Sequence, residues 1–197
     1  MMRSLNEILE NVNSTVANRI SASRILMLPF YLIYHYMGEY SISFALAFYM
    51  VISDFLDGYV ARLYGEISEF GKILDPIADK AVTLTLFVSL LAGSYGLIER
   101  SLWRSIIITS LGLLALEAVL IILGHWAAKK NLHNGSNLFG KAKMITESYI
   151  FLFGYYFFFL NPGLSPLAEI GRSINDLLYV AVGLAFLSII GHITEKR

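Results

Sequence analysis

The chain has 197 residues, of which 56% are hydrophobic and 15% are charged, and its mean hydropathy is +0.62. Soluble domains carry about 25% charged residues, so this composition excludes a small soluble domain and indicates a membrane protein. The net charge of zero excludes the basic surface of a nucleic-acid-binding protein, and the absence of cysteine excludes disulfides and thiolate metal ligands.

Residues 1–17 are predicted to form an amphipathic helix that lies in the membrane interface. Their apolar residues recur at helical spacing with polar residues between them, which is typical of such helices. These apolar residues are Leu5, Ile8, Leu9, Val12 and Val16. The segment has no apolar core run, so it does not resemble a signal peptide.

Six apolar segments follow, each close to the roughly 20 residues that a helix needs to cross a bilayer. They are residues 20–37, 41–64, 73–94, 103–127, 143–160 and 174–193. Turn signals at Gly38, Gly93–Gly96 and Asn161–Gly163 separate some of them. Because the chain has no internal repeat and no linker, we expect an all-α integral membrane domain in which residues 18–197 form one six-helix bundle.

The positions of Lys and Arg predict the orientation of this bundle. Twelve of the fifteen lie in the N-terminal segment, in the second-to-third and fourth-to-fifth connections, or in the C-terminal tail. The opposite side holds only Arg100, Arg104 and Arg172. Since positive residues concentrate on the cytoplasmic side, both termini are predicted to be cytoplasmic.

Four aspartates interrupt the apolar segments: Asp54 and Asp57 in the second, Asp75 and Asp79 in the third. A carboxylate near the bilayer centre costs roughly 2.5–3.5 kcal/mol, so we expect these residues to serve a function. The members of each pair are three or four residues apart and therefore lie on one helix face. A short connection joins the two helices, so all four carboxylates are expected to converge near the inner surface.

Four carboxylates in one place repel one another unless cations lie among them. Arg62 and Lys80 account for part of the neutralisation, and divalent metal ions explain the full cluster most simply. Oxygen-only ligation suits Mg²⁺ or Mn²⁺, and two such ions about 3.5–4 Å apart serve displacement at phosphorus. The spacing alone also allows a charge-paired helix interface or a proton or cation pathway.

The residues around the acids resemble the full motif of the CDP-alcohol phosphotransferase family. The pattern reads Asp54-x2-Asp57-Gly58-x2-Ala61-Arg62-x8-Gly71-x3-Asp75-x3-Asp79. Eight fixed positions over 26 residues make the match specific, and the predicted six-span layout is also similar to that family.

This resemblance implies a transfer reaction that depends on two Mg²⁺ or Mn²⁺ ions. A phosphatidyl or similar group moves from a CDP-linked donor such as CDP-diacylglycerol to an alcohol, and CMP is released. By position in the motif, the metal ligands are Asp54, Asp57, Asp75 and Asp79, with Asp79 also the general base. The CDP site is lined by Asp57, Gly58, Ala61, Arg62 and Gly71.

Further segments resemble the phosphatidylglycerophosphate synthases and related cardiolipin synthases within the family. They are Asn18-x2-Ser21-x2-Arg24, Leu74–Lys80 and Gly140–Lys143. Asn18, Arg24, Lys141 and Lys143 are therefore candidates for binding the acceptor, most simply glycerol 3-phosphate. Leu116-Glu117 departs from the subgroup, which commonly has an arginine before the acid. Glu117 and Glu147 are expected to pair with a lysine or with polar backbone.

Other functions remain open at this stage. The acceptor is alternatively phosphatidylglycerol, as in a cardiolipin-type enzyme, or another polyol phosphate. A cation transporter would string its carboxylates along the membrane depth, whereas here they lie at one depth without a repeat. An inactive scaffold is disfavoured by the intact motif. The resemblance also implies a homodimer embedded in membrane lipids, with its active site at the cytoplasmic face.

Overall fold

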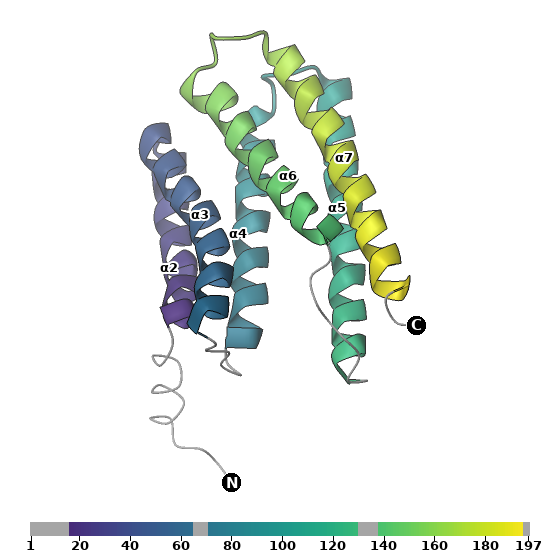
Figure 1. Cartoon of the computed structure of the whole chain (residues 1–197). Helices are drawn as coiled ribbons and strands as arrows, with labels where there is room; N and C mark the ends of the chain where they lie inside the picture. The colour runs from purple at the N-terminus through teal and green to yellow at the C-terminus, as the bar shows by residue number, and fades with distance from the viewer. Residues whose placement is uncertain (1–15, 65–70, 130–137, 195–197) are drawn as a thin grey trace. The chain divides into compact units, whose positions relative to one another are not determined.

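Helices make up all the regular structure in the part of the chain that the computed structural model describes, residues 16–64, 71–129 and 138–194. Side chains are described within 19–56, 77–123 and 138–191. The elements are α2 (Val16–Tyr36), α3 (Tyr40–Tyr64), α4 (Gly71–Ser94), α5 (Arg100–Lys129), α6 (Leu138–Tyr155), the π-helix η1 (Tyr156–Leu160) and α7 (Leu167–Thr194) (Figure 1). All six predicted apolar segments are therefore confirmed as helical. The predicted interfacial helix falls on residues 1–15, outside the described part.

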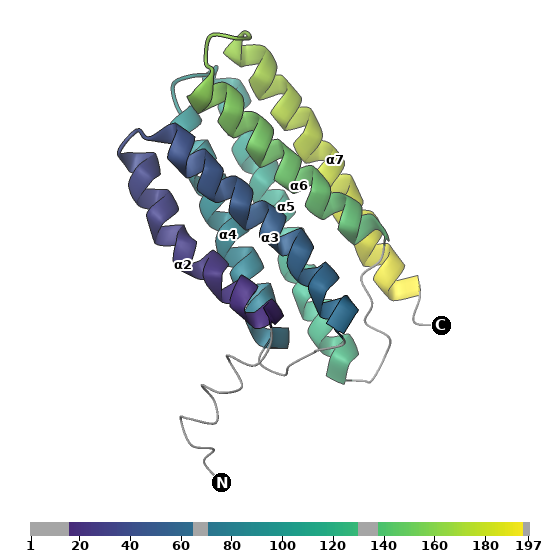
Figure 2. The same cartoon turned by 60° about the vertical axis from the view of Figure 1, so that its left-hand side comes forward.

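The helices form two compact units, Met1–Ser89 and Leu90–Arg197. In the first unit α2 and α3 pack along each other, as Figures 1 and 2 both show. Their connection is short because Gly38 adopts a φ of +81°, which confirms the turn predicted there. The Tyr31 hydroxyl of α2 bonds to the Ser89 hydroxyl of α4 at 2.5 Å, which ties α4 to α2.

In the second unit α7 packs against both α5 and α6. The C-terminal turn of α4 belongs to this unit, and there Trp103 Nε1 donates a hydrogen bond to the carbonyl of Leu91 at 3.0 Å. Gly93 lies against the ring of Phe159 so closely that a Cβ would approach ring carbon Cζ to 2.3 Å. A side chain at position 93 would therefore require the Phe159 ring of η1 to move.

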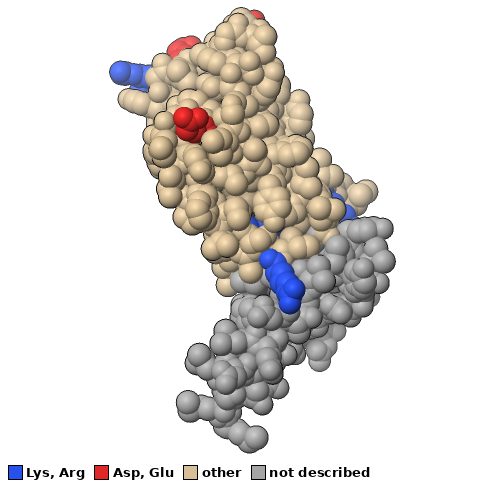
Figure 3. Space-filling model, turned by 90° about the vertical axis from the view of Figure 1, so that its left-hand side faces the viewer, with Lys and Arg blue, Asp and Glu red and all other residues tan. Residues whose placement is uncertain are grey.

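Among the residues whose side chains are described, three helices are long and apolar enough to cross a membrane: Ile77–Ser94 of α4, Arg100–Leu123 of α5 and Leu167–Gly191 of α7. A shorter apolar stretch, Tyr40–Leu56, lies in α3. On the face drawn in Figure 3, Lys, Arg, Asp and Glu lie in the upper part of the coloured surface or next to the grey residues, and a broad uncharged surface lies between them. Large apolar side chains such as Ile108 and Ile122 are mostly exposed on α5. These features are those of an integral membrane protein.

Candidate active site

All eight motif positions lie on two consecutive helices of the first unit. Five of them follow one another on α3: Asp54, Asp57, Gly58, Ala61 and Arg62. The other three lie on α4, which begins at Gly71 and continues through Asp75 and Asp79. The side chains of Asp54 and Asp79 are described, whereas those of the other six motif residues lie outside the described part.

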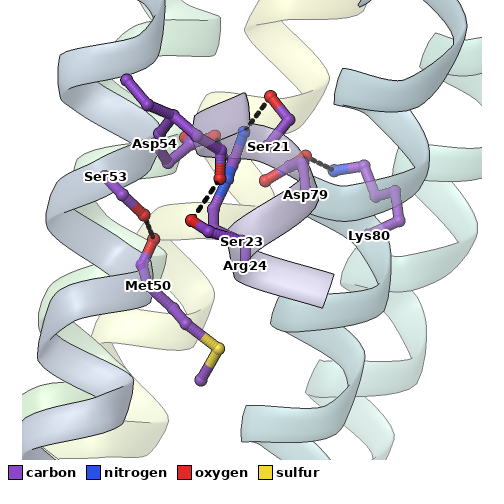
Figure 4. Close-up of polar contacts among 9 residues, drawn as sticks. Ser21, Ser23, Arg24, Met50, Ser53, Asp54, Asp79 and Lys80 are labelled. Atoms are coloured by element: carbon purple, nitrogen blue, oxygen red, sulfur yellow. Dashed lines mark hydrogen bonds and ion pairs between the residues drawn. The ribbon is translucent and has the colours of Figure 1, made fainter. Parts of the chain in front are cut away.

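Asp54 is bound by an arginine from the neighbouring helix. Arg24 Nη1 of α2 forms an ion pair with Asp54 Oδ1 of α3, and Arg24 Nη2 donates a hydrogen bond to Ser21 Oγ at 3.2 Å (Figure 4). The Arg24 side chain is 2% exposed, while that of Asp54 is 22% exposed. Solvent is therefore almost excluded from the arginine of this pair but reaches the carboxylate.

The local sequence explains why α2 and α3 approach closely enough for this pair. Ala47 and Met50 of α3 are fully buried, and the buried Ser53 hydroxyl bonds to the carbonyl of Met50 in its own helix at 2.9 Å. Ser23 of α2 and the Tyr49 hydroxyl of α3 bond at 2.8 Å. Small and polar residues at this interface let the helices pack closely and give the Arg24 guanidinium its partners.

Asp79, the expected general base, is accessible. Its Oδ2 lies 3.1 Å from Lys80 Nζ, and the two side chains are 29% and 34% exposed. In the view of Figure 4, Arg24 lies between Asp54 and Asp79. The expected partial neutralisation by Lys80 is confirmed, and a pair this exposed is weak enough for Asp79 to exchange partners.

The donor chemistry of the motif fits a hard divalent cation, because carboxylate oxygen is the ligand that Mg²⁺ and Mn²⁺ prefer. Among the side chains that the structure describes, no three His, Asp or Glu residues gather as a metal-binding group. Two of the four proposed ligands, Asp57 and Asp75, lie outside that set of side chains.

A second group of buried charges lies in the second unit. Lys143 Nζ of α6 forms an ion pair with Glu117 Oε1 of α5 and lies 3.4 Å from Glu147 Oε1, one turn further along α6. The expected pairing of both glutamates with a lysine is thus confirmed. Lys141, two residues before Lys143, is exposed. Of the four candidate acceptor-binding residues, Arg24 and Lys143 are buried, Lys141 is exposed, and the side chain of Asn18 is not among those described.

Reasoning from the sequence missed the pairing of Arg24 with Asp54. A signal was available, because an arginine within an apolar helix needs an anionic partner. The residues are 30 positions apart on different helices, so the sequence does not say which carboxylate that partner is.

Comparison with curated proteins finds relatives with one recurrent name, CDP-diacylglycerol–glycerol-3-phosphate 3-phosphatidyltransferase. The relative from Aquifex aeolicus is 34% identical over 126 residues, which cover 64% of this chain and 67% of that protein. The relative from Mycoplasma pneumoniae is 33% identical over 132 residues, covering 67% of this chain and 52% of that protein. The relative from Mycoplasma genitalium is 35% identical over 82 residues, which cover 40% of this chain and 35% of that protein. The chain thus spans between about a third and two thirds of the length of these relatives.

A family model described as CDP-alcohol phosphatidyltransferase matches residues 14–190. This match extends over both compact units, from before the first residue of α2 to Ile190 within α7. It also contains the eight-position motif on α3 and α4. The chain belongs to the CDP-alcohol phosphatidyltransferase family.

Proposed function

We propose that the chain transfers a phosphatidyl group from CDP-diacylglycerol to glycerol 3-phosphate and releases CMP. The observation that carries this proposal is the complete eight-position motif on two consecutive helices of one unit. The relatives described above are named for this donor and this acceptor. Because the family model crosses the boundary between the two units, we further propose that both serve one catalytic domain.

The metal site of this proposal consists of Asp54, Asp57, Asp75 and Asp79. The family in general depends on divalent metal, and the all-oxygen donor set favours two Mg²⁺ or Mn²⁺ ions. When bound, such ions neutralise the charge of the donor diphosphate. The CDP group is proposed to lie along Asp57, Gly58, Ala61, Arg62 and Gly71, where small residues let a nucleotide approach the helix backbone.

Asp79 is proposed to act as the general base. Its carboxylate accepts the proton of the acceptor hydroxyl while the hydroxyl oxygen attacks the donor phosphorus. The bond from that phosphorus to the CMP oxygen breaks, and CMP leaves with the bonding electrons. The partial exposure of Asp79 and its weak pairing with Lys80 support a carboxylate that a substrate can reach.

For the acceptor phosphate, we favour Lys141, because it is the exposed one among the candidate cations Arg24, Lys141 and Lys143. It is exposed near the start of α6, whereas Lys143 is buried between Glu117 and Glu147. Asn18 remains a candidate by its position in the motif alone. Because Lys143 and Arg24 are buried, we propose that they act on the carboxylates that they contact and do not bind the acceptor phosphate.

We also propose that all six long α-helices cross the membrane, that both termini are cytoplasmic, and that the active site lies at the cytoplasmic face. The 12-to-3 distribution of Lys and Arg supports this orientation. Since the chain has no cysteine, single cysteines can report sidedness directly. A cysteine replacing the exposed Leu164 should react with a membrane-impermeant maleimide in intact cells, whereas one replacing Lys141 should react only after permeabilisation. The opposite labelling pattern would overturn the orientation.

A cardiolipin-type reaction with phosphatidylglycerol is the second candidate. Leu116 stands where the similar subgroup commonly has an arginine, so one positive charge for a phosphorylated acceptor is lacking. The homodimer implied by the resemblance stays a prediction.

The test is CMP release from CDP-diacylglycerol by the purified chain in detergent with Mn²⁺ or Mg²⁺. The acceptors are glycerol 3-phosphate, phosphatidylglycerol, inositol phosphate and serine. We expect release with glycerol 3-phosphate, its loss in Asp79→Asn and on addition of EDTA, and its retention in Asp176→Asn, an exposed carboxylate of α7. Release with phosphatidylglycerol alone would establish the second candidate, and no release with any acceptor would overturn the proposed reaction.

A further inference from the structure

Arg24 is among the most completely buried residues in the described part of the chain, because the residue as a whole is 1% exposed. A guanidinium keeps its charge at any physiological pH, so burying it requires partners of opposite charge or good acceptors. The structure supplies Asp54 Oδ1 and Ser21 Oγ. Among the side-chain contacts described, Arg24 meets the motif at Asp54.

The same burial argues against a direct contact between Arg24 and the acceptor. A small anion that bound the guanidinium would have to enter a site where the Arg24 side chain is only 2% exposed. Lys141 and Lys80, by contrast, are cations with exposed side-chain surface.

A carboxylate has two oxygens and about four lone-pair sites, so it can accept a bond from an arginine and still bind a metal ion. A hydrogen bond to one oxygen restricts the rotation of the group. Residues that bond to metal ligands in this way orient them, and losing such a residue typically reduces metal affinity about 10–100-fold.

We propose that Arg24 is a positioning residue that holds Asp54 in the orientation in which it binds metal, and that it does not bind the acceptor. This inference rests on the proposed metal site. Ser21 supports Arg24 from the preceding turn of α2 and is the second member of the arrangement.

The test measures Mn²⁺ binding to the purified chain without substrate, by the electron paramagnetic resonance signal of free Mn²⁺. Arg24→Gln should raise the dissociation constant for Mn²⁺ about tenfold, and Arg24→Lys should raise it less because an ammonium still donates to Asp54. Arg19→Gln is the matched control, because it removes the same charge from an exposed position on the same helix. Its Mn²⁺ affinity should equal that of the unsubstituted chain.

Loss of the positive charge alone would tighten Mn²⁺ binding, so weaker binding in Arg24→Gln isolates the loss of orientation. The accompanying kinetics should show a lower kcat at fixed Mn²⁺ and a KM for glycerol 3-phosphate that changes less than about twofold. Unchanged or tighter Mn²⁺ binding, or a raised KM for the acceptor alone, would overturn the positioning role.

The binding measurement needs no acceptor, so it separates this inference from the proposed reaction. Mn²⁺ binding that weakens in Arg24→Gln in a chain that releases no CMP would support the positioning role and reject the reaction. If the unsubstituted chain releases CMP but Arg24→Gln leaves Mn²⁺ binding unchanged, the reaction is supported and the positioning role is rejected. No Mn²⁺ binding by the unsubstituted chain would overturn the metal site and this inference with it.

Discussion

The two compact units each bury a cation against carboxylates, and they do so differently. In the first unit Arg24 is 2% exposed, but its partner Asp54 is 22% exposed. In the second unit Lys143, Glu117 and Glu147 are 4–8% exposed, so both charges of every pair are enclosed. The first arrangement leaves a carboxylate within reach of a ligand, and the second does not.

On the proposed function, we expect this difference to distinguish the carboxylate that binds metal from carboxylates that serve the fold. A charge pair closed on all sides depends on its members for neutralisation, because water cannot replace a lost partner. A pair with one open side has water or a metal ion as an alternative. The consequences for stability and for function should therefore differ between the two units.

The largest effect on stability is expected from Lys143→Met. The change removes an ammonium that two enclosed carboxylates contact, and breaking a buried pair in this way costs about 3–5 kcal/mol. Unfolding in detergent mixtures with increasing dodecyl sulfate measures the loss. Lys141→Met is the matched control and should change the unfolding free energy by less than about 0.5 kcal/mol, because Lys141 is exposed. Equal effects of the two substitutions would contradict the enclosed cluster.

A smaller loss is expected from Arg24→Met. Removing a hydrogen-bond donor to a charged group costs about 1.5–3 kcal/mol, and water can reach the partly exposed Asp54. The same unfolding measurement applies. A loss as large as that of Lys143→Met would mean that Asp54 is as enclosed as the two glutamates.

Neutralising Glu117, Lys143 and Glu147 together should restore most of the stability that Lys143→Met loses. The triple variant Glu117→Gln, Lys143→Met, Glu147→Gln leaves none of these three charges in place. Replacing all members of a buried ion pair together often changes the stability of a protein little. We expect an unfolding free energy within about 1–2 kcal/mol of the unsubstituted chain. If the triple variant is as unstable as Lys143→Met, the glutamates have a further role beyond pairing with this lysine.

The smallest effect is expected from Ser21→Ala, which removes one of the hydrogen bonds described for Arg24. The loss is about 0.5–1.5 kcal/mol, the range for a single hydrogen bond, with a slight weakening of Mn²⁺ binding. Ser53→Ala, which removes a hydroxyl bonded only within α3 among the bonds described, should leave Mn²⁺ binding unchanged. If Ser21→Ala and Ser53→Ala bind Mn²⁺ with the same affinity, Ser21 does not help Arg24 to position Asp54.

The sequence predicted the helices well, because a long apolar run in a membrane chain must hydrogen-bond internally. It placed the ends less well. Helix α5 begins at Arg100 and α7 at Leu167, earlier than residues 103 and 174, since helix ends extend beyond the apolar run that hydropathy detects. The π-helix η1 left no periodic signal, so it was not predicted.

At the site, the motif could be read from sequence because its spacing lies within two helices. The pair of Lys143 and Glu147 follows an i, i+4 spacing that was also readable. The contacts of Arg24 with Asp54 and of Lys143 with Glu117 could not be derived, because they depend on how one helix is rotated against another. For this reason the sequence made Arg24 and Lys143 candidates for binding the acceptor. Their burial instead favours roles through the carboxylates that they contact.

The π-turn at Tyr156–Leu160 bears on how the chain tolerates insertions and deletions. Its Asn161 amide bonds to the Tyr156 carbonyl at 2.9 Å, so the turn contains one residue more than an α-turn. We expect that deleting one residue from this segment converts it to ordinary α-helix. The deletion would also rotate Phe159 away from Gly93, whose missing Cβ leaves room for this ring. The length of this segment, as well as its composition, therefore determines which aromatic ring meets the glycine.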